Sequence, residues 1–196
     1  MPSVDAPPVD VVAMVGSAGG IRATESVLEQ LPVGLEAAVV ILLHLMAQHR
    51  SHLVEILGRR TPMAVKEAED GEKLVTGTVF VAPPDTHLRV EGGRFILEDS
   101  ALVHFVRPSA DVLLFSLAGG HAGRRLVVVL SGSGVDGAAG AAAVRRAGGS
   151  VLAQDEATSE HFGMPGAAIL AGGVDQVLAL DRIGGAVVDF VHGSAA

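Results

Sequence analysis

Three valine- and leucine-rich runs, each followed by glycine or a polar residue, limit what this chain can fold into. They span residues 11–15, 37–43 and 125–130. Continuous apolar runs of this length are typical of strands buried on both faces, as in a parallel sheet that helices cover on each side. The runs therefore predict the central strands of an α/β fold.

Helix-forming segments separate the apolar runs. Residues 21–31 carry apolar side chains at helical spacing and end at Pro32, and residues 137–147 are an alanine-rich segment that two glycines terminate. The alternation predicts a three-layer α/β/α sandwich with a mainly parallel, doubly wound sheet. Further helices are expected at 52–59, 110–118, 165–171 and 183–191, and further strands at 150–153 and 176–180.

The middle of the chain has a different pattern. Residues 73–82 alternate between apolar and polar side chains and end at two prolines. Residues 88–90 and 95–97 flank the sequence Glu-Gly-Gly-Arg, which is a hairpin signal. We therefore expect an antiparallel β-hairpin insertion in this region.

Length and charge narrow the class of protein. The 196 residues predict one folded domain over 10–193, preceded by a flexible leader over 1–9. A net charge of −8 argues against nucleic-acid binding through the phosphate backbone, which needs a basic surface. The sequence has no apolar stretch of about 18 residues and no basic signal region, so we expect a cytoplasmic protein without membrane insertion. The chain has no cysteine, which excludes a thiolate nucleophile.

The residues that follow the three buried runs form one chemical set. Ser17 lies in Gly-Ser-Ala-Gly-Gly after the first run, His44 directly follows the second, and Asp136 lies in Ser-Gly-Ser-Gly-Val-Asp-Gly after the third. Neighbouring parallel strands bring their carboxyl ends to one sheet edge, where such folds bind ligands. A histidine that takes the serine proton, held by a carboxylate, makes serine a nucleophile. The sequence predicts a serine hydrolase with Ser17 as nucleophile, His44 as base and Asp136 as orienting acid.

The turn that contains Ser17 suits this chemistry. A nucleophile on a sharp strand-to-helix turn needs neighbours with small or no side chains, and the following helix directs N–H groups at the site. Such donors hold the oxyanion that develops during attack on an ester. We expect Ala18 and Gly19 to contribute to oxyanion or substrate binding.

Other interpretations of the same residues stay open. A glycine-rich turn after a first strand is also typical of phosphate binding, although the spacing here is not G-x-G-x-x-G. His44 could be a buried structural histidine, and Asp136 could cap the helix that follows it. On chemistry alone, rival bases exist: His87, His104, His121 and His161.

A metal centre is not expected. His44, His49 and His52 have a spacing that could suggest metal ligands, but the chain has no cysteine and no nearby H-E-x-x-H pattern. We predict no metal site.

Several segments, in order along the chain, resemble the chemotaxis protein-glutamate methylesterases (the CheB catalytic domain). They are residues 11–20, 65–72, 82–87, 107–111, 131–140, 153–157 and 162–165. The resemblance implies a serine hydrolase that demethylates γ-glutamyl methyl esters on chemoreceptors and can deamidate their glutamines, with no metal or organic cofactor. It also implies that the N–H of Ser133 is an oxyanion donor. In the Arg-Pro-Ser segment, we expect Arg107 to bind substrate; the alternative is that Arg107 only pairs with a structural carboxylate.

Departures from the family pattern surround the expected triad. The family usually has Thr at Ala18, Met at Ser133, Asn at Val135 and His at Val106, and Gln-His-Met-Pro around the base instead of Leu-His-Leu-Met at 43–46. They predict a triad with fewer orienting polar groups and hence a weak esterase. The alternative is a module without turnover that docks on a receptor or a methyltransferase.

The expected partners follow from the resemblance. The substrate would be a methylated chemoreceptor or similar protein, with a methyltransferase or a response regulator as a further partner. The chain has no counterpart of the receiver domain that precedes the catalytic domain in this family, so we expect a stand-alone catalytic domain.

Overall fold

The structure is a computed structural model that describes residues 8–44 and 52–193. Its strands are β1 (Asp10–Gly16), β2 (Ala37–Leu43), β3 (Ala64–Glu67), β4 (Thr78–Val81), β5 (His87–Glu91), β6 (Arg94–Glu98), β7 (Arg125–Val129), β8 (Ser150–Gln154) and β9 (Gln176–Leu178). Its helices are α1 (Gly20–Leu28), α2 (Leu53–Gly58), α3 (Ala110–Gly120), α4 (Ala138–Arg146), α5 (Gly163–Leu170) and α6 (Leu180–His192). Residues 1–7 of the expected leader lie outside the described residues, and so does His49.

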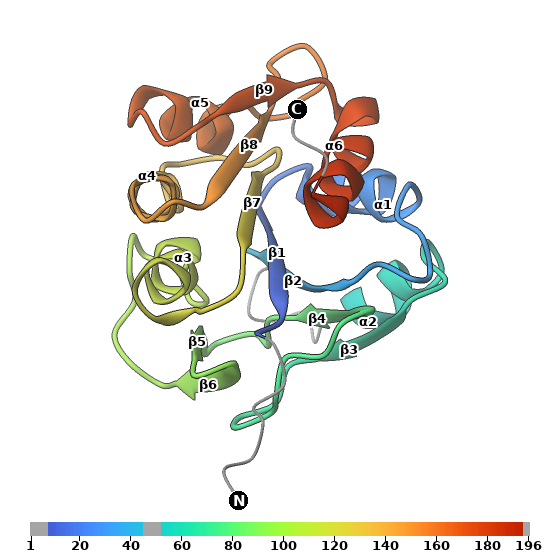
Figure 1. The fold of residues 1–196 in the computed structure, drawn as a ribbon. Coiled ribbons are helices and arrows are strands. Elements are labelled where there is room, and N and C mark those ends of the chain that lie inside the picture. Colours follow the sequence, from blue (N-terminus) through green and yellow to red (C-terminus); the bar gives the residue numbers. More distant parts are fainter. Residues whose placement is uncertain (1–7, 45–51, 194–196) are drawn as a thin grey trace, which may run out of the picture.

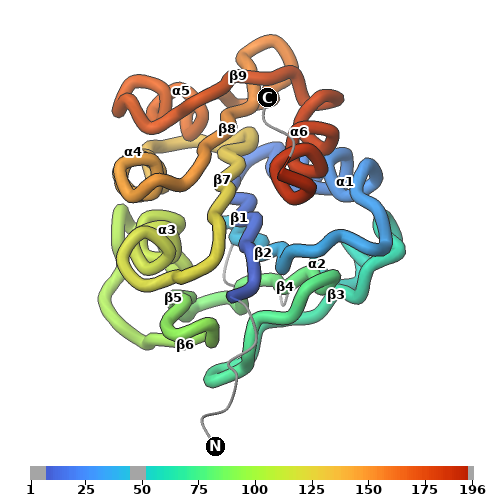
Figure 2. The backbone as a smooth tube through the Cα atoms, in the orientation of Figure 1, coloured from blue at the N-terminus to red at the C-terminus, as the bar shows by residue number. Residues whose placement is uncertain are grey.

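Seven parallel strands form the central sheet, in the order β3-β4-β2-β1-β7-β8-β9 (Figure 1). The chain starts at β1 in the middle, moves outward through β2 to β3 and β4, and returns to add β7, β8 and β9 on the other side of β1 (Figure 2). The doubly wound α/β fold is therefore confirmed. Ligands bind at the carboxyl ends of the strands where the winding reverses, which here is the β1–β7 junction.

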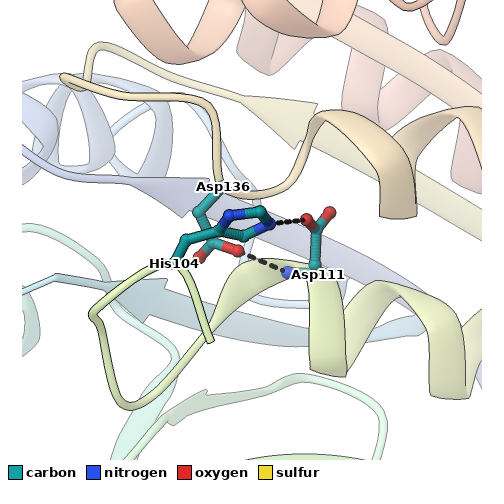
Figure 3. Close-up of side chains that lie close together, drawn as sticks. All are labelled: His104, Asp111 and Asp136. Atoms are coloured by element: carbon teal, nitrogen blue, oxygen red, sulfur yellow. Dashed lines mark hydrogen bonds and ion pairs between the residues drawn. The ribbon is translucent and has the colours of Figure 1, made fainter. Parts of the chain in front are cut away.

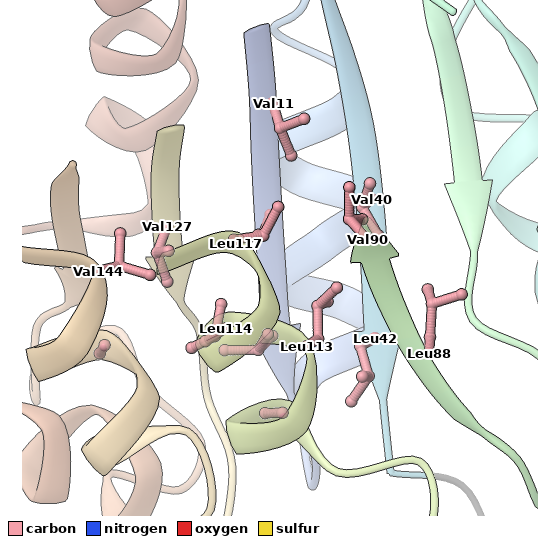
Figure 4. Close-up of a cluster of buried hydrophobic side chains, with 14 of the residues drawn as sticks. Val11, Val40, Leu42, Leu88, Val90, Leu113, Leu114, Leu117, Val127 and Val144 are labelled. Atoms are coloured by element: carbon pink, nitrogen blue, oxygen red, sulfur yellow. The ribbon is translucent and has the colours of Figure 1, made fainter. Parts of the chain in front are cut away.

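Helices cover both faces of the sheet because successive residues of each strand point to opposite sides. Val12 and Met14 of β1 pack with α1, α2 and α6, whereas Val11, Ala13 and Val15 face α3, α4 and α5. Figure 4 shows side chains of β1, β2 and β7 facing those of α3, α4 and the hairpin strand β5. Burial on both faces explains why these strands read as unbroken apolar runs.

The region 64–98 needs a correction. Only β5 and β6 form the predicted antiparallel hairpin, which packs on α3. The start of 73–82 does pair with the insertion, through an antiparallel bridge between Lys73 and Arg94, but the expectation is wrong for β4, which pairs in parallel with β2 in the main sheet. The sequence also gave no sign of β3, since this edge strand is half-buried to exposed and carries the charged residues Lys66 and Glu67.

No helix in the described ranges is both long and apolar enough to cross a membrane.

Candidate active site

Strand pairing sets Ser17 beside His44. Gly16 of β1 pairs with Leu43 of β2, so the next residue of each strand stands at the same level of the sheet edge. The N–H of His44 donates to the carbonyl of Gly16 at 3.1 Å, which extends the pairing by one bond. The sheet therefore brings the expected nucleophile and base together by register alone.

The turn after β1 needs glycine at position 19. Gly19 has φ of 77°, and a Cβ there would lie 2.6 Å from Ser131 Oγ and 2.8 Å from Glu160 Cβ. The turn is tied to the end of β7, since the N–H of Ser17 donates to the carbonyl of Ser131 at 3.0 Å and Ser131 Oγ donates to the carbonyl of Ala18 at 2.8 Å. These bonds fix the backbone on which the Ser17 hydroxyl stands.

A surface pocket of about 470 Å³ opens above this turn. Its lining residues come from the β1–α1 turn, the first turn of α1, the end of β2 and the β8–α5 loop: Ser17, Ala18, Gly19, Ile21, Arg22, His44 and Glu160. His44 is the one described histidine in this lining. The rival bases lie outside it: His87, His104, His121 and His161.

His44 is held by the predicted acid. Its Nε2 lies 2.8 Å from Asp136 Oδ2, and the two side chains are 11% and 5% exposed. Because Nε2 faces the carboxylate, Nδ1 is the ring nitrogen available to take a proton in the pocket. The Ser17 hydroxyl makes no hydrogen bond to any residue in the described ranges, and catalytic contacts of this kind often form only when substrate binds.

Asp136 accepts three further hydrogen bonds, all from the start of α3. Ser109 Oγ donates at 2.7 Å, the N–H of Ala110 at 2.6 Å and the N–H of Asp111 at 3.1 Å. Burial acts to raise the pKa of Asp136, but the hydrogen bonds from His44, Ser109 and the two backbone groups outweigh it and hold the pKa below its ordinary value. Asp136 is therefore an anion fixed at a helix N-terminus.

The alternative that Asp136 caps the helix following it is wrong. The N-cap of α4 is Gly137, with no side-chain hydrogen bond at that helix end. Asp136 instead accepts the first N–H groups of α3, which lies far away in sequence. The alternative of a purely structural His44 stays untested, although its bond to Asp136 in the pocket supports a catalytic role.

A second carboxylate, Asp111, lies next to Asp136 (Figure 3). It accepts the N–H of Gly140 at 2.7 Å and lies 3.1 Å from His104 Nε2, and burial raises its pKa. Possible ligand atoms of His104, Asp111 and Asp136 lie within 4.8 Å of one another. Both carboxylates, however, already accept N–H or O–H donors, so this cluster is a hydrogen-bonded network with little capacity for a cation.

Two backbone N–H groups near Ser17 are available to an oxyanion. Neither the N–H of Ala18 nor that of Ser133 has a hydrogen-bond acceptor within the described part of the chain. Ser133 is exposed and follows Gly132, whose position leaves no room for a Cβ because one would lie 2.9 Å from the N atom of Ser17. Ser133 does not line the pocket itself, so its donor role stays a prediction.

Comparison with known proteins agrees with this geometry. The family model described as CheB methylesterase matches residues 12–187. This chain belongs to the CheB methylesterase family. The crystal structure of the Thermotoga maritima CheB methylesterase catalytic domain superimposes with a TM-score of 0.88 at 33% identity, and the match covers 93% of this chain and 98% of that one.

Curated relatives of the CheB methylesterase family are longer than this chain. A protein-glutamate methylesterase/protein-glutamine glutaminase of Maricaulis maris is 38% identical over 91% of this chain and 46% of its own length. The protein-glutamate methylesterase FrzG of Myxococcus xanthus is 38% identical over 94% of this chain and 56% of its own length. The chain thus spans about half the length of these relatives.

The structure places Arg107 away from the pocket that this CheB-type domain forms. Its guanidinium donates to Asp85 at 2.7 Å, to Asp99, and to the carbonyl of Ser100 at 2.7 Å. The hydrogen bond and charge of Asp85 raise the pKa of Arg107 above its already high ordinary value. Its predicted role in substrate binding stays untested, and its present contacts hold a loop.

The positions that depart from the CheB family pattern lie in different surroundings in the structure. Ala18 lines the pocket, whereas the Val135 side chain is 57% exposed on the loop before Asp136. Leu45 and Met46 lie outside the described residues. A polar side chain at position 18 would therefore enter the pocket, and one at position 135 would mostly meet water.

Sequence reasoning missed four residues of this CheB-type site. Ser109 binds the acid, and Ile21, Arg22 and Glu160 line the pocket with Ser17. The Arg-Pro-Ser segment contains Ser109, but its pattern predicted a functional role for the arginine and none for the serine. Arg22 and Glu160 had no signal, because a charged residue on a loop or helix surface is usually just solvated.

Proposed function

We propose that this chain is a serine hydrolase that demethylates γ-glutamyl methyl esters, and deamidates glutamines, on chemoreceptor-type proteins. The observation that carries the proposal is the His44–Asp136 hydrogen bond of 2.8 Å at the rim of the pocket that also contains Ser17. Membership of the CheB methylesterase family and relatives named protein-glutamate methylesterase support the reaction and substrate.

The chemical steps follow from the arrangement of the site. His44 Nδ1 takes the proton of Ser17 while Oγ attacks the ester carbonyl carbon, and the N–H groups of Ala18 and Ser133 receive the oxyanion. Collapse of the tetrahedral intermediate releases methanol, which takes the proton from His44. Water, deprotonated by His44, then attacks the acyl-enzyme, and His44 gives that proton to Ser17 Oγ as it leaves, which frees the serine and the glutamate side chain, whose acid ionises in solvent.

Asp136 supports both steps and stays deprotonated throughout. Imidazolium forms at His44 twice in the cycle, and a fixed anion beside Nε2 stabilises it. The lowered pKa of Asp136 keeps that anion charged at neutral pH. Deamidation uses the same steps with ammonia as the leaving group.

The substrate and partners are part of the proposal. A methylated chemoreceptor or a similar protein would be the substrate, in the cytoplasm, with a methyltransferase or a response regulator as a further partner. Nucleic acid is not a proposed ligand, given the net charge of −8.

The phosphate-binding alternative is disfavoured by the contacts of the turn. Arg22, the cation in the pocket lining, lies 3.9 Å from Glu160, and Glu160 beside Gly19 would repel a phosphate. The N–H of Ser17, which a phosphate loop would present to its ligand, is already bonded to Ser131. A binding module without turnover remains the second candidate, since the Ser17 hydroxyl has no hydrogen bond in the described structure.

Covalent labelling separates the esterase from the binding module. A fluorophosphonate probe reacts only with an activated serine, so wild type should label, Ser17→Ala should not, and Ser26→Ala on α1 should label like wild type. Release of methanol from a peptide with a γ-glutamyl methyl ester then tests the substrate class. Absence of labelling and of turnover on any ester would favour the binding module.

A further inference from the structure

Ser109 is fully buried and contacts the acid of the proposed triad. It is 0% exposed, and its Oγ lies 2.7 Å from Asp136 Oδ1. Among the described donors to this carboxylate it supplies the only hydroxyl, since the others are the His44 ring and two backbone N–H groups. No step of the proposed mechanism uses it.

The backbone of Ser109 is hydrogen-bonded to a buried histidine, His87. The N–H of Ser109 donates to His87 Nδ1 at 3.1 Å, and His87 Nε2 lies 3.0 Å from the carbonyl of Ala101. A carbonyl only accepts hydrogen bonds, so Nε2 carries the hydrogen and Nδ1 is the acceptor. His87 is 0% exposed, and its two bonds connect Ser109 to the preceding loop.

The bonds on Asp136 are divided between its two oxygens. Oδ2 receives His44 at 2.8 Å and the N–H of Ala110 at 2.6 Å, whereas Oδ1 receives Ser109 Oγ and the N–H of Asp111. Donors on both oxygens resist rotation of the carboxylate plane. The orientation of the oxygen that faces His44 therefore depends on what binds the other oxygen.

We propose that Ser109 is a positioning residue for the proposed hydrolysis: its hydroxyl fixes the Asp136 carboxylate in the orientation that holds His44. The proposal rests on the proposed function of the site. It assigns a role to the Arg-Pro-Ser segment, in which the serine reaches the triad while Arg107 binds Asp85 and Asp99 outside it.

Other charged or titratable groups face the His44–Asp136 pair. A test based on pH requires a substitution that leaves these groups in place. Asp111 and His104 lie on the α3 side, His87 of β5 accepts the N–H of Ser109, and Arg22 and Glu160 line the pocket. A substitution at Ser109 changes none of their charges. A shift in the pH profile of a Ser109 variant therefore reports on the lost hydrogen bond.

Ser109→Ala is the test, with Ser116→Ala as the matched control. Ser116 is also on α3, and its hydroxyl donates to the carbonyl of Leu113 and accepts the N–H of Val90 without touching Asp136. We expect Ser109→Ala to lower kcat on an activated ester by about 10- to 100-fold with KM unchanged. The acid limb of kcat/KM, which reports protonation of the base, should also move up, because a carboxylate that loses a donor keeps more negative charge to stabilise the imidazolium form of His44.

Two further measurements make the outcome decisive. Ser109→Cys keeps a similar shape with a weak donor, so it should give a smaller shift and replaces Ser109→Ala if that variant does not fold. Fluorophosphonate labelling of wild type at Ser17 checks the underlying function, and its failure would overturn both proposals. If wild type labels but Ser109→Ala matches Ser116→Ala in kcat, or keeps the wild-type acid limb, the positioning role alone is overturned.

Discussion

Two glycine-rich loops follow the neighbouring strands β1 and β7. They differ in how far their polar side chain is buried and hydrogen-bonded. The turn of the proposed nucleophile, residues 16–20, leaves Ser17 half-buried at a pocket, and its hydroxyl has no hydrogen bond in the described structure. The acid loop, residues 131–137, buries Asp136 under donors from the end of β2 and the start of α3. A group that attacks substrate needs freedom, whereas a group that orients another has to be fixed. Similar glycine content thus serves opposite purposes.

The largest effects should come from the two polar residues themselves. Ser17→Ala should lower turnover by about 10⁶-fold and leave the thermal midpoint close to that of wild type, since no bond of the hydroxyl is lost. Asp136→Asn should lower turnover by about 10⁴-fold and also lower the midpoint, because an amide NH₂ group would face the donors of α3. Ester hydrolysis and thermal unfolding measure both. Equal midpoints for the two variants would contradict the comparison.

A pair of glycine substitutions compares the backbones of the two loops. Gly19 and Gly134 both have positive φ, 77° and 90°, but only at Gly19 would a Cβ meet other atoms. Gly134→Ala should cost about 1–2 kcal/mol of unfolding free energy from its conformation alone. Gly19→Ala should cost more, and should reduce labelling of Ser17, because Ser131 and Glu160 have to move. Urea unfolding and probe labelling test this, and equal losses would mean that the close contacts do not matter.

The pH dependence of stability should have opposite signs at the two buried carboxylates. The pKa of Asp136 is lowered, so its charge stabilises the fold above the unfolded value of about 3.9, and this is lost as the pH falls through the folded pKa. Burial raises the pKa of Asp111, so its ionisation costs stability as the pH rises above about 3.9. Relative to wild type, the deficit of Asp136→Asn should be larger at pH 7 than at pH 3, and that of Asp111→Asn smaller. Urea unfolding at both pH values checks the signs.

Restoring polar groups beside the triad should have a modest effect. Ala18→Thr with Val135→Asn should raise hydrolysis of an activated ester by roughly two- to fivefold, because added hydrogen bonds orient the site. Most of the gain should come from Ala18→Thr, since Ala18 lines the pocket and Val135 is mainly exposed. Unchanged turnover of the double variant, with Ser17→Ala still inactive, would contradict this orienting role and leave the triad intact.

The smallest effect is expected at Arg107. Its partners Asp85 and Asp99 are exposed, and exposed ion pairs contribute little. If Arg107 mainly holds the loop before Ser109, Arg107→Ala should lower kcat about two- to threefold and leave KM unchanged. A rise in KM with unchanged kcat would instead support the substrate-binding role that the sequence predicts.

Much of the fold could be predicted from local patterns. Strands buried on both faces produce unbroken apolar runs, so β1, β2 and β7 were found within one residue of their ends. The strand β3 had no such pattern, because an edge strand carries charge and stays partly exposed. The strand β4 was assigned to the wrong sheet, since an alternating run does not reveal its partner.

The sequence by itself determined which residues are proposed for the chemistry of the site, and the tertiary structure decided how these residues are held. Ser17, His44 and Asp136 could be selected because each follows a strand of one parallel sheet, and the family resemblance follows from motifs in order. That Asp136 accepts the first N–H groups of α3, and that Ser109 and His87 lie behind it, could not be predicted. Local patterns record which residues repeat along a chain, whereas the contact between the β7–α4 loop and α3 exists only once the chain has folded back on itself.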